Sequence, residues 1–252
     1  LKNPNGILLV TGPTGSGKST TLYTALSELN NEDVNIITVE DPVEANIDGI
    51  NQVQVNPKAE LTFASALRSI LRQDPDIIMI GEIRDGETAQ IAVQASITGH
   101  LVVSTLHTNS AAATISRLED MGIESYLLAD SLVGIIAQRL VRRLCPNCKK
   151  EHYATEEEKK VMNIDENGDI LIYEAPGCEK CDNTGYTGRI GIYEILTVTQ
   201  NIKKLISRRA TADEVARAAQ TEGMHTLRQS ATKLVLEGTT SYKEMLRTTF
   251  EN

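Results

Sequence analysis

Short aliphatic runs alternate with longer amphipathic stretches through the first 120 or so residues. Each run is bounded by glycine, proline or acidic residues, as in Gly6-Ile7-Leu8-Leu9-Val10. A strand buried on both faces of a parallel sheet has this nearly continuous aliphatic character. The runs that we expect to be strands are 7–10, 35–39, 76–80 and 100–105.

The stretches between these runs have the length and polarity of helices. We expect helices over 18–30, 62–73 and 86–97, with Thr62 as the N-cap of the second and Asp74-Pro75 ending it. Strands that alternate with helices predict a parallel α/β sheet covered by helices on both faces.

The pattern changes after about Asp120. Residues 124–144 are expected to form one helix, whose basic last turn suits the negative end of the helix dipole. A loop-rich segment then carries all the cysteines, and 189–196 has the pattern of a returning strand. From Thr199 onward we expect three or four short amphipathic helices, one opened by a capping box at Thr211–Glu214. The sequence therefore divides into a core (1–144), a cysteine lobe (145–188) and a strand with a helical subdomain (189–252).

Composition limits the kinds of partner. The chain has 252 residues, a formal net charge of −9 and a pI of about 5.1. Binding to nucleic acid or anionic lipid needs Lys and Arg, so this balance disfavours direct contact with nucleic acid. No apolar run approaches the roughly 18 residues of a membrane span, and we expect no membrane insertion. The chain has no signal peptide and does not begin with Met, so we interpret it as a fragment of a longer protein.

A phosphate-binding loop follows the first expected strand. Gly12-Pro13-Thr14-Gly15-Ser16-Gly17-Lys18-Ser19 matches G-x-x-x-x-G-K-[ST] between a strand and a helix, and we include the adjoining Thr20 in the nucleotide site. Such a loop turns its amides toward phosphate oxygens at a helix N-terminus. Lys18 reaches the β- and γ-phosphates of ATP, and the Ser19 hydroxyl coordinates Mg²⁺. Gly-rich turns also occur for backbone reasons alone, but the complete motif in this context predicts nucleotide binding.

Acidic residues follow two other expected strands. Glu40-Asp41-Pro42-Val43-Glu44 comes after the second strand and Gly81-Glu82-Ile83-Arg84-Asp85 after the third. Because ligands bind at the carboxyl ends of parallel strands, we expect catalytic acids here rather than merely solvated ones. His107 follows the fourth strand and is a candidate for sensing phosphate, although a lone histidine is more often structural.

The cysteines form two C-x₂-C pairs, Cys145/Cys148 and Cys178/Cys181. The stretch between the pairs exceeds the about 15–20 residues of a usual zinc motif, so it must fold or loop out. Four thiolates suit structural Zn²⁺. Disulfides and redox activity of one pair are the alternatives. His152 could in principle be a ligand, but we treat it as structural, as we do His225.

Taken together, these segments resemble the secretion ATPases of type II secretion and type IV pilus assembly. The Walker A loop is Gly12–Ser19, the Asp box is Ile37–Glu44, the Walker B segment is Asp76–Asp85 and the His box is Gly99–Asn109. The similarity continues through Gln138–Cys145 and Gly185–Arg189. It implies a RecA-like P-loop NTPase fold, α/β with a mostly parallel sheet, a small tetracysteine zinc lobe and a C-terminal helical subdomain.

The resemblance also implies a role for each matching residue. Glu40 corresponds to the carboxylate that activates water, and Glu82 to the Walker B acid that acts on Mg²⁺. His107 corresponds to the contact with the γ-phosphate. Lys18 completes the catalytic set.

At the level of the assembly, the resemblance implies an ATP-hydrolysing homo-hexamer on the cytoplasmic face of the inner membrane. Its expected partners are a membrane-embedded platform protein and a cytoplasmic adaptor, and its expected work is pilin extraction or type II secretion. The resemblance further implies an N-terminal domain that supplies arginines to the nucleotide, and we expect that domain to lie outside this chain. A tetracysteine lobe favours assembly or secretion over pilus retraction.

Two other classes of function stay open. A nucleic-acid-translocating motor shares the P-loop core but needs a basic, aromatic-bearing channel, which the composition disfavours. A binding module with an inactive nucleotide fold would not need Glu40, Glu82 and Lys18. An ATPase that drives a DNA-uptake pseudopilus is a variant of the first interpretation.

Overall fold

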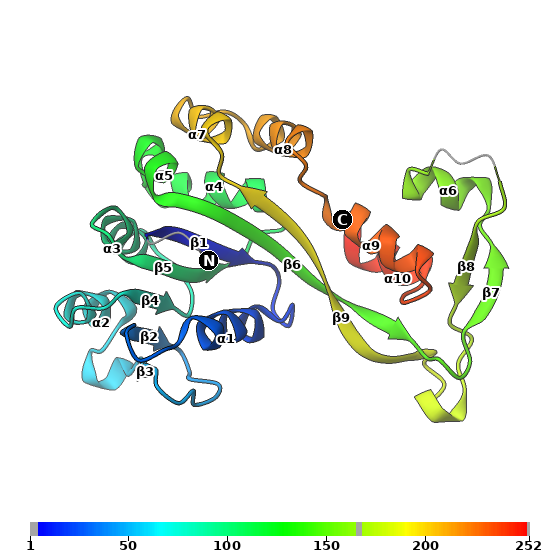
Figure 1. Ribbon diagram of the computed structural model, residues 1–252, viewed down its shortest axis with the longest axis horizontal. Coiled ribbons are helices and arrows are strands. Elements are labelled where there is room, and N and C mark those ends of the chain that lie inside the picture. The colour runs from blue at the N-terminus through cyan, green and yellow to red at the C-terminus, as the bar shows by residue number, and fades with distance from the viewer. Residues whose placement is uncertain (1–4, 165–167, 251–252) are drawn as a thin grey trace. The chain divides into compact units, whose positions relative to one another are not determined.

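The protein is described by a computed structural model covering residues 5–164 and 168–250. The chain forms two compact units (Figure 1). The first contains Leu1–Ala137 and Ile195–Met224, and the second contains Gln138–Glu194 and His225–Asn252. The division of the sequence at residues 144 and 188 stays a prediction.

Within the described residues, one seven-stranded sheet has the order β3-β2-β4-β5-β1-β6-β9. The paired strands β1/β5, β1/β6, β2/β3, β2/β4 and β4/β5 are parallel, whereas β9 runs opposite to its neighbour β6 (Figure 1). The bounds are β1 Gly6–Thr11, β2 Ile36–Glu40, β3 Asn51–Gln54, β4 Ile77–Ile80, β5 Leu101–Leu106, β6 Leu132–Leu144 and β9 Tyr186–Thr197. The predicted parallel α/β sheet is confirmed, with each aliphatic run in place.

The helices of the first unit connect and follow these strands. They are α1 Lys18–Leu29, α2 Phe63–Ile70, α3 Gly86–Ile97, α4 Ala111–Asp120, α5 Ser125–Ser131, α7 Gln200–Ser207 and α8 Ala212–Thr221, with a 3₁₀ turn η1 at Pro57–Ala59. Thr62 caps α2 as predicted, accepting a hydrogen bond from the Ser65 amide at 3.2 Å, but α2 ends at Ile70, before Gln73. Thr211 and Glu214 form the predicted capping box of α8.

The prediction of one helix over 124–144 is wrong. The helix α5 ends at Ser131, and β6 continues from Leu132 to Leu144. Residues 132–137 pair with β1, whose other side is occupied by β5. This segment holds Gly134 and several β-branched residues, which favour strand over helix. Pairing with the free edge of β1 therefore outweighs the local signal of the basic residues, which indicated a helix C-terminus.

The core of the first unit lies where α1 packs on the sheet. Leu22 and Leu26 project from one face of α1, because residues four apart lie on the same side of a helix. They pack with buried strand residues, and Leu8, Tyr23 and Leu29 lie against this cluster. The partners from the strands are Val10, Ile36, Ile77, Met79, Leu101 and Val103. This packing fixes the helix that follows the phosphate loop.

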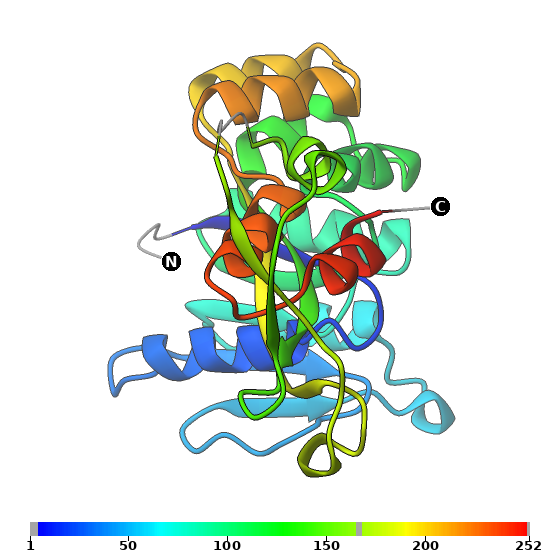
Figure 2. The ribbon, with the colours of Figure 1, turned by 90° about the vertical axis from the view of Figure 1, so that its right-hand side faces the viewer.

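The second unit contains the segment between the cysteine pairs. This segment is folded, as an antiparallel hairpin (Figure 2) with a helix between its strands. The elements are β7 Lys150–Tyr153, α6 Glu156–Met162, β8 Leu171–Glu174, the 3₁₀ turn η2 Glu179–Cys181, α9 Leu227–Leu236 and α10 Tyr242–Thr249. Together, α7, α8, α9 and α10 confirm the predicted run of short helices. Among the described residues, no helix is both long and apolar enough to cross a membrane.

A buried carboxylate joins α10 to β6 in this unit. Glu244 is 0% exposed. It accepts hydrogen bonds from the Arg142 amide at 3.0 Å and from the Arg142 Nη2 at 2.7 Å, and Arg247 Nη2 donates at 2.6 Å. Burial raises the pKa of Glu244, but the two arginines outweigh burial and lower it from 4.5 to about 2. Arg142 also stacks 4.0 Å above the Tyr186 ring.

We expect Glu244→Gln to destabilise the second unit by about 3 kcal/mol, because it leaves two guanidinium groups without their shared charge. A carboxylate with a lowered folded-state pKa stabilises the fold above its unfolded pKa. The difference in melting temperature between wild type and variant should therefore be largest at pH 7 and should shrink as the pH falls from 4.5 toward about 2. The exposed Glu237→Gln is the matched control. Equal melting temperatures for Glu244→Gln and Glu237→Gln at pH 7 would contradict the expected stabilisation.

Candidate functional site

The loop between β1 and α1 is built from glycines with positive φ. Gly15 has a φ of 77° and Gly17 a φ of 85°, values that residues with a Cβ adopt only under strain. Gly17 precedes the first turn of α1 and has no side-chain cap, so the backbone curls directly into the helix N-terminus. Four of the predicted loop residues stay exposed to solvent there: Pro13, Thr14, Gly15 and Thr20.

Lys18 is folded back into this loop. Its ammonium donates to the carbonyl oxygens of Gly12 at 2.8 Å and Pro13 at 3.1 Å. The residue is 8% exposed, and burial lowers its pKa, although the charge of Glu82 acts in the opposite direction. The cation predicted to bind phosphate therefore lies inside the loop and in the field of Glu82.

The next residue, Ser19, contacts the acidic loop that follows β2. Its hydroxyl donates to Glu44 Oε1 at 2.8 Å. A hydroxyl oxygen beside a carboxylate is the kind of oxygen ligand set that Mg²⁺ accepts. The donor types thus fit the predicted metal.

Glu40, the last residue of β2, lies in a web of donors. It is 4% exposed. Its Oε1 accepts hydrogen bonds from the Thr38 hydroxyl at 2.5 Å and from the Gln52 side-chain amide at 3.2 Å. Its Oε2 accepts a hydrogen bond from the Tyr23 hydroxyl. Burial raises the pKa of Tyr23, and the hydrogen bond to Glu40 raises it further. The structure therefore fixes the orientation of this carboxylate through neighbouring side chains.

Glu82 follows β4 and joins two more of the predicted residues. His107 Nε2 lies 3.5 Å from its Oε2, and Arg84 forms an ion pair with its Oε1. The hydrogen bond that Arg84 donates to Glu82 is the main cause that raises the pKa of Arg84. Asp85, in contrast, accepts from the Thr88 amide at 2.8 Å and caps α3, so it is a structural residue of this acidic cluster.

The loop that carries His107 is tied to the base of the phosphate loop. The Thr108 amide donates to the Thr11 hydroxyl at 2.8 Å, and the two hydroxyl groups lie 2.7 Å apart. Thr11 is fully buried at the end of β1. These bonds hold the end of β5 beside the end of β1.

The sheet order explains why distant motifs meet. The neighbours β2, β4, β5 and β1 are parallel, so their carboxyl ends lie at one edge. Glu40 is the last residue of β2, and Glu82, His107 and the phosphate loop follow the ends of β4, β5 and β1. The contacts Ser19–Glu44 and Tyr23–Glu40 connect α1 to the acidic residues. An ammonium group, backbone amides and carboxylates at one edge can bind a triphosphate, its metal and an attacking water.

Sequence reasoning missed two supports of this site, Tyr23 and Thr11. Each had a weak signal. A tyrosine on the core face of a helix needs a partner for its hydroxyl. A threonine at the end of an aliphatic strand, directly before the glycine loop, similarly needs a partner once buried.

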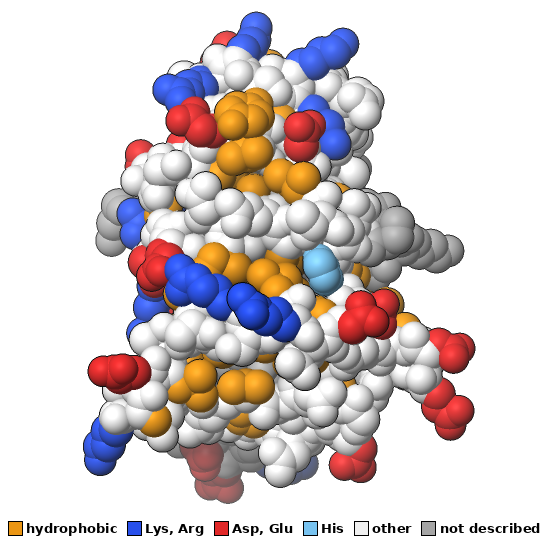
Figure 3. Space-filling model, turned by 90° about the vertical axis from the view of Figure 1, so that its left-hand side faces the viewer, with side chains coloured by type: hydrophobic (Ala, Val, Ile, Leu, Met, Phe, Trp, Pro, Cys, Tyr) orange, Lys and Arg blue, Asp and Glu red, His pale blue; other side chains and the backbone are white. Residues whose placement is uncertain are grey.

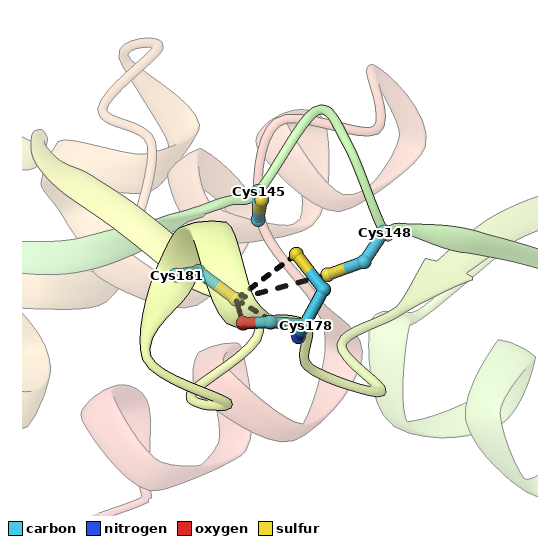
Figure 4. A group of neighbouring side chains, drawn as sticks. All are labelled: Cys145, Cys148, Cys178 and Cys181. Atoms are coloured by element: carbon cyan, nitrogen blue, oxygen red, sulfur yellow. Dashed lines mark hydrogen bonds between the residues drawn. The ribbon is translucent and has the colours of Figure 1, made fainter.

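The cysteines form a second candidate site, within the second unit (Figure 4). Cys145 and Cys148 follow β6, whereas Cys178 directly precedes η2 and Cys181 is its last residue. All four are free thiols, and their sulfur atoms lie within 4.8 Å of one another. The Cys181 sulfur lies 3.9 Å from that of Cys148 and 3.7 Å from that of Cys178.

These distances fit a tetrahedral zinc site. Four sulfurs at about 2.3 Å from one zinc ion lie about 3.8 Å apart, well beyond the roughly 2 Å of a disulfide. Burial raises the pKa of Cys181, but the amides of Cys178 and Gly185, each 3.2 Å from its sulfur, outweigh burial and lower that pKa to about 6. Burial raises the pKa of the neighbouring Cys148 to about 12, so of these two thiols Cys181 more readily forms the thiolate, which is the form that binds metal. His152 is outside this cluster and faces Glu158, with Nε2 3.5 Å from Oε1.

Comparisons with known proteins identify the family of this chain. The family model described as "Type II/IV secretion system protein" matches residues 1–247. "Type II secretion system ATPase E" of Vibrio cholerae is 52% identical over 252 residues, covering 100% of this chain and 50% of the relative. "Type IV pilus assembly ATPase PilB" of Acinetobacter baylyi is 52% identical over 255 residues, covering 100% and 44%. The chain spans about half the length of these curated relatives.

Solved structures show the same fold. The crystal structure of the pilus retraction motor PilT with bound ADP matches with a TM-score of 0.74 and 31% identity, covering 99% of this chain and 62% of that one. The Legionella pneumophila ATPase DotB matches with a TM-score of 0.69 and 25% identity, covering 96% and 59%. The predicted P-loop α/β fold with a four-cysteine lobe is confirmed. This chain belongs to the family of type II/IV secretion system proteins.

Proposed function

We propose that this chain is the ATP-binding and ATP-hydrolysing part of a motor that powers type II secretion or type IV pilus assembly. The observation that carries the proposal is that the phosphate loop and the helix α1 that follows it interact with acidic residues at the carboxyl edge of the sheet. Ser19 reaches Glu44, Tyr23 reaches Glu40, and the charge of Glu82 acts on Lys18. The names of the relatives, which include secretion and pilus assembly ATPases, support the same activity.

In this proposal, each residue has a stated task. The loop amides and Lys18 hold the β- and γ-phosphates of ATP, exchanging the loop carbonyls that Lys18 now contacts for phosphate oxygens. Ser19 and Glu82 hold Mg²⁺, which neutralises phosphate charge when it is bound. Glu40 accepts the proton of the attacking water, and His107 contacts the γ-phosphate.

The cysteine lobe has a structural task. We propose that Cys145, Cys148, Cys178 and Cys181 hold one Zn²⁺ ion. Four protein thiolates leave zinc no open position, so the ion braces the loops after β6 and around η2 rather than taking part in catalysis.

The motor as a whole is proposed to be a homo-hexamer at the cytoplasmic face of the inner membrane. A platform protein in that membrane and a cytoplasmic adaptor are its proposed partners. The support is the membership of the family and the similarity to secretion and pilus ATPases. Because the relatives are about twice as long, these properties belong to the full-length protein.

A motor that translocates nucleic acid is disfavoured by the surface charges of the first unit. Several of its arginines are paired with glutamates, and acidic and basic side chains stand interspersed on the face drawn in Figure 3. The pairs are Arg68–Glu87, Arg208–Glu214 and Arg209–Glu124. A strand of phosphates needs unpaired cations along its path.

Lys18→Ala in the full-length protein tests the proposal. Loss of a charged hydrogen bond to phosphate costs about 1.5–3 kcal/mol, so we expect ATP to bind about 10- to 150-fold more weakly. Steady-state hydrolysis should fall to background. The exposed Lys58→Ala is the matched control. Hydrolysis by Lys18→Ala at the rate of Lys58→Ala would refute the proposed nucleotide site.

A further inference from the structure

Tyr23 links the helix of the phosphate loop to the carboxylate at the end of β2. It lies on α1, five residues after Lys18, and its ring packs against the core beneath the site. Its hydroxyl donates to Glu40 Oε2 and accepts a hydrogen bond from the Glu44 amide at 3.1 Å. One phenol therefore contacts both glutamates of the acidic loop.

The other oxygen of Glu40 is held from a different direction. Thr38, on the same strand, donates to Oε1 at 2.5 Å, and Gln52 of β3 donates at 3.2 Å. Donors on both oxygens fix the rotation of the carboxylate as well as its position. Gly81 lets the backbones of the two strands approach closely here, because a Cβ at this position would lie only 3.3 Å from the Glu40 Cα.

The hydrogen-bond donors to the two oxygens of Glu40 belong to different parts of the fold. Thr38 and Gln52 belong to neighbouring strands of the sheet, which are rigid by their pairing. Tyr23 belongs to α1, which begins at Lys18 and Ser19. A displacement of α1 on phosphate binding would therefore reach Glu40 through the Tyr23 ring, which rotates about only two side-chain bonds.

We propose that Tyr23 is a positioning residue that aims Glu40 at the attacking water and couples its orientation to the nucleotide held by the phosphate loop. This inference rests on the proposed function, since it assumes that Glu40 activates water. Tyr23 itself does not touch the reacting atoms. The competing explanation is that Tyr23 only stabilises the packing of α1 on the sheet.

The two explanations predict different kinetics for Tyr23→Phe, which removes the hydroxyl and keeps the ring. A misdirected base costs about 10- to 100-fold in kcat. If Tyr23 positions Glu40, kcat for ATP hydrolysis should fall by that factor in the full-length protein. The KM, the Kd for ATP and the melting temperature should stay close to wild type. Tyr126→Phe, at a tyrosine 60% exposed on α5, is the matched control and should change none of them.

A double-mutant cycle separates positioning from stability. If Tyr23 acts through Glu40, then Tyr23→Phe should change the residual single-turnover rate of Glu40→Gln by less than about twofold. Wild-type kcat in Tyr23→Phe overturns the inference. A parallel loss of ATP affinity and thermal stability, or the full kcat loss persisting in the Glu40→Gln background, also overturns it.

The proposed function can fail separately. Wild-type protein that does not hydrolyse ATP would refute the ATPase proposal, whatever Tyr23→Phe does. If the wild type hydrolyses ATP and Tyr23→Phe hydrolyses it at the same rate, only the positioning role is refuted.

Discussion

Replacing Glu40 by glutamine should leave ATP binding intact and lower turnover by about 10²- to 10⁴-fold, the usual contribution of a positioned general base. Glutamine has nearly the same shape, and its amide oxygen can still accept from Thr38 and Gln52, so the fold should tolerate the change. What it loses is the ability to accept a proton from water. The measurement is single-turnover hydrolysis by the full-length protein with ATP affinity determined in parallel.

The control for this substitution is Glu28→Gln, an exposed position on α1. It makes the same chemical change in the same unit and should hydrolyse ATP at the wild-type rate. If Glu40→Gln matches Glu28→Gln in turnover, then Glu40 is not the base. If Glu40→Gln instead loses ATP binding, its role is in holding the nucleotide rather than in activating water.

Loss of the proposed zinc ion should have the largest effect on stability. Structural zinc sites contribute folding free energy directly, and zinc binding to small domains is worth roughly 10–16 kcal/mol at neutral pH. We expect Cys181→Ser to lower zinc content from about one ion per chain to near zero. The segment between the cysteine pairs should then become sensitive to limited proteolysis, because its anchoring loops are released.

His152→Gln is the control, because it removes an imidazole, a group that can bind metal in general, from a position outside the cysteine cluster. It should retain zinc. Metal analysis under reducing conditions decides between the alternatives. A wild-type protein without zinc, or one whose cysteines are found as disulfides after purification with reductant, would contradict the structural zinc site.

The parts of the fold that the sequence predicts are those with local signals. The aliphatic runs, the complete Gly12–Ser19 motif and the caps at Thr62 and Thr211 are each readable within a few residues. Acids at strand ends could be assigned to one edge because parallel strands share a direction. That rule predicts that Glu40, Glu82 and His107 lie at the same edge of the sheet.

The rest depends on pairing between distant segments. Residues 132–144 become a strand because β1 offers them a partner, and local helix signals cannot reveal that. Likewise, the hydrogen bonds of Tyr23 to Glu40 and of two arginines to Glu244 join residues that the sequence pattern leaves unrelated. In each case a buried polar group is satisfied by a partner that only the fold supplies.

The central claim is that backbone amides and the Lys18 ammonium hold a triphosphate at the edge of the sheet. Its most direct measurement is calorimetric titration of ATP with magnesium into the full-length wild-type protein and its Lys18→Ala variant. We expect saturable uptake of about one nucleotide per chain by wild type and greatly weakened uptake by the variant. No heat of binding to wild type, or identical isotherms for the two proteins, would contradict the claim.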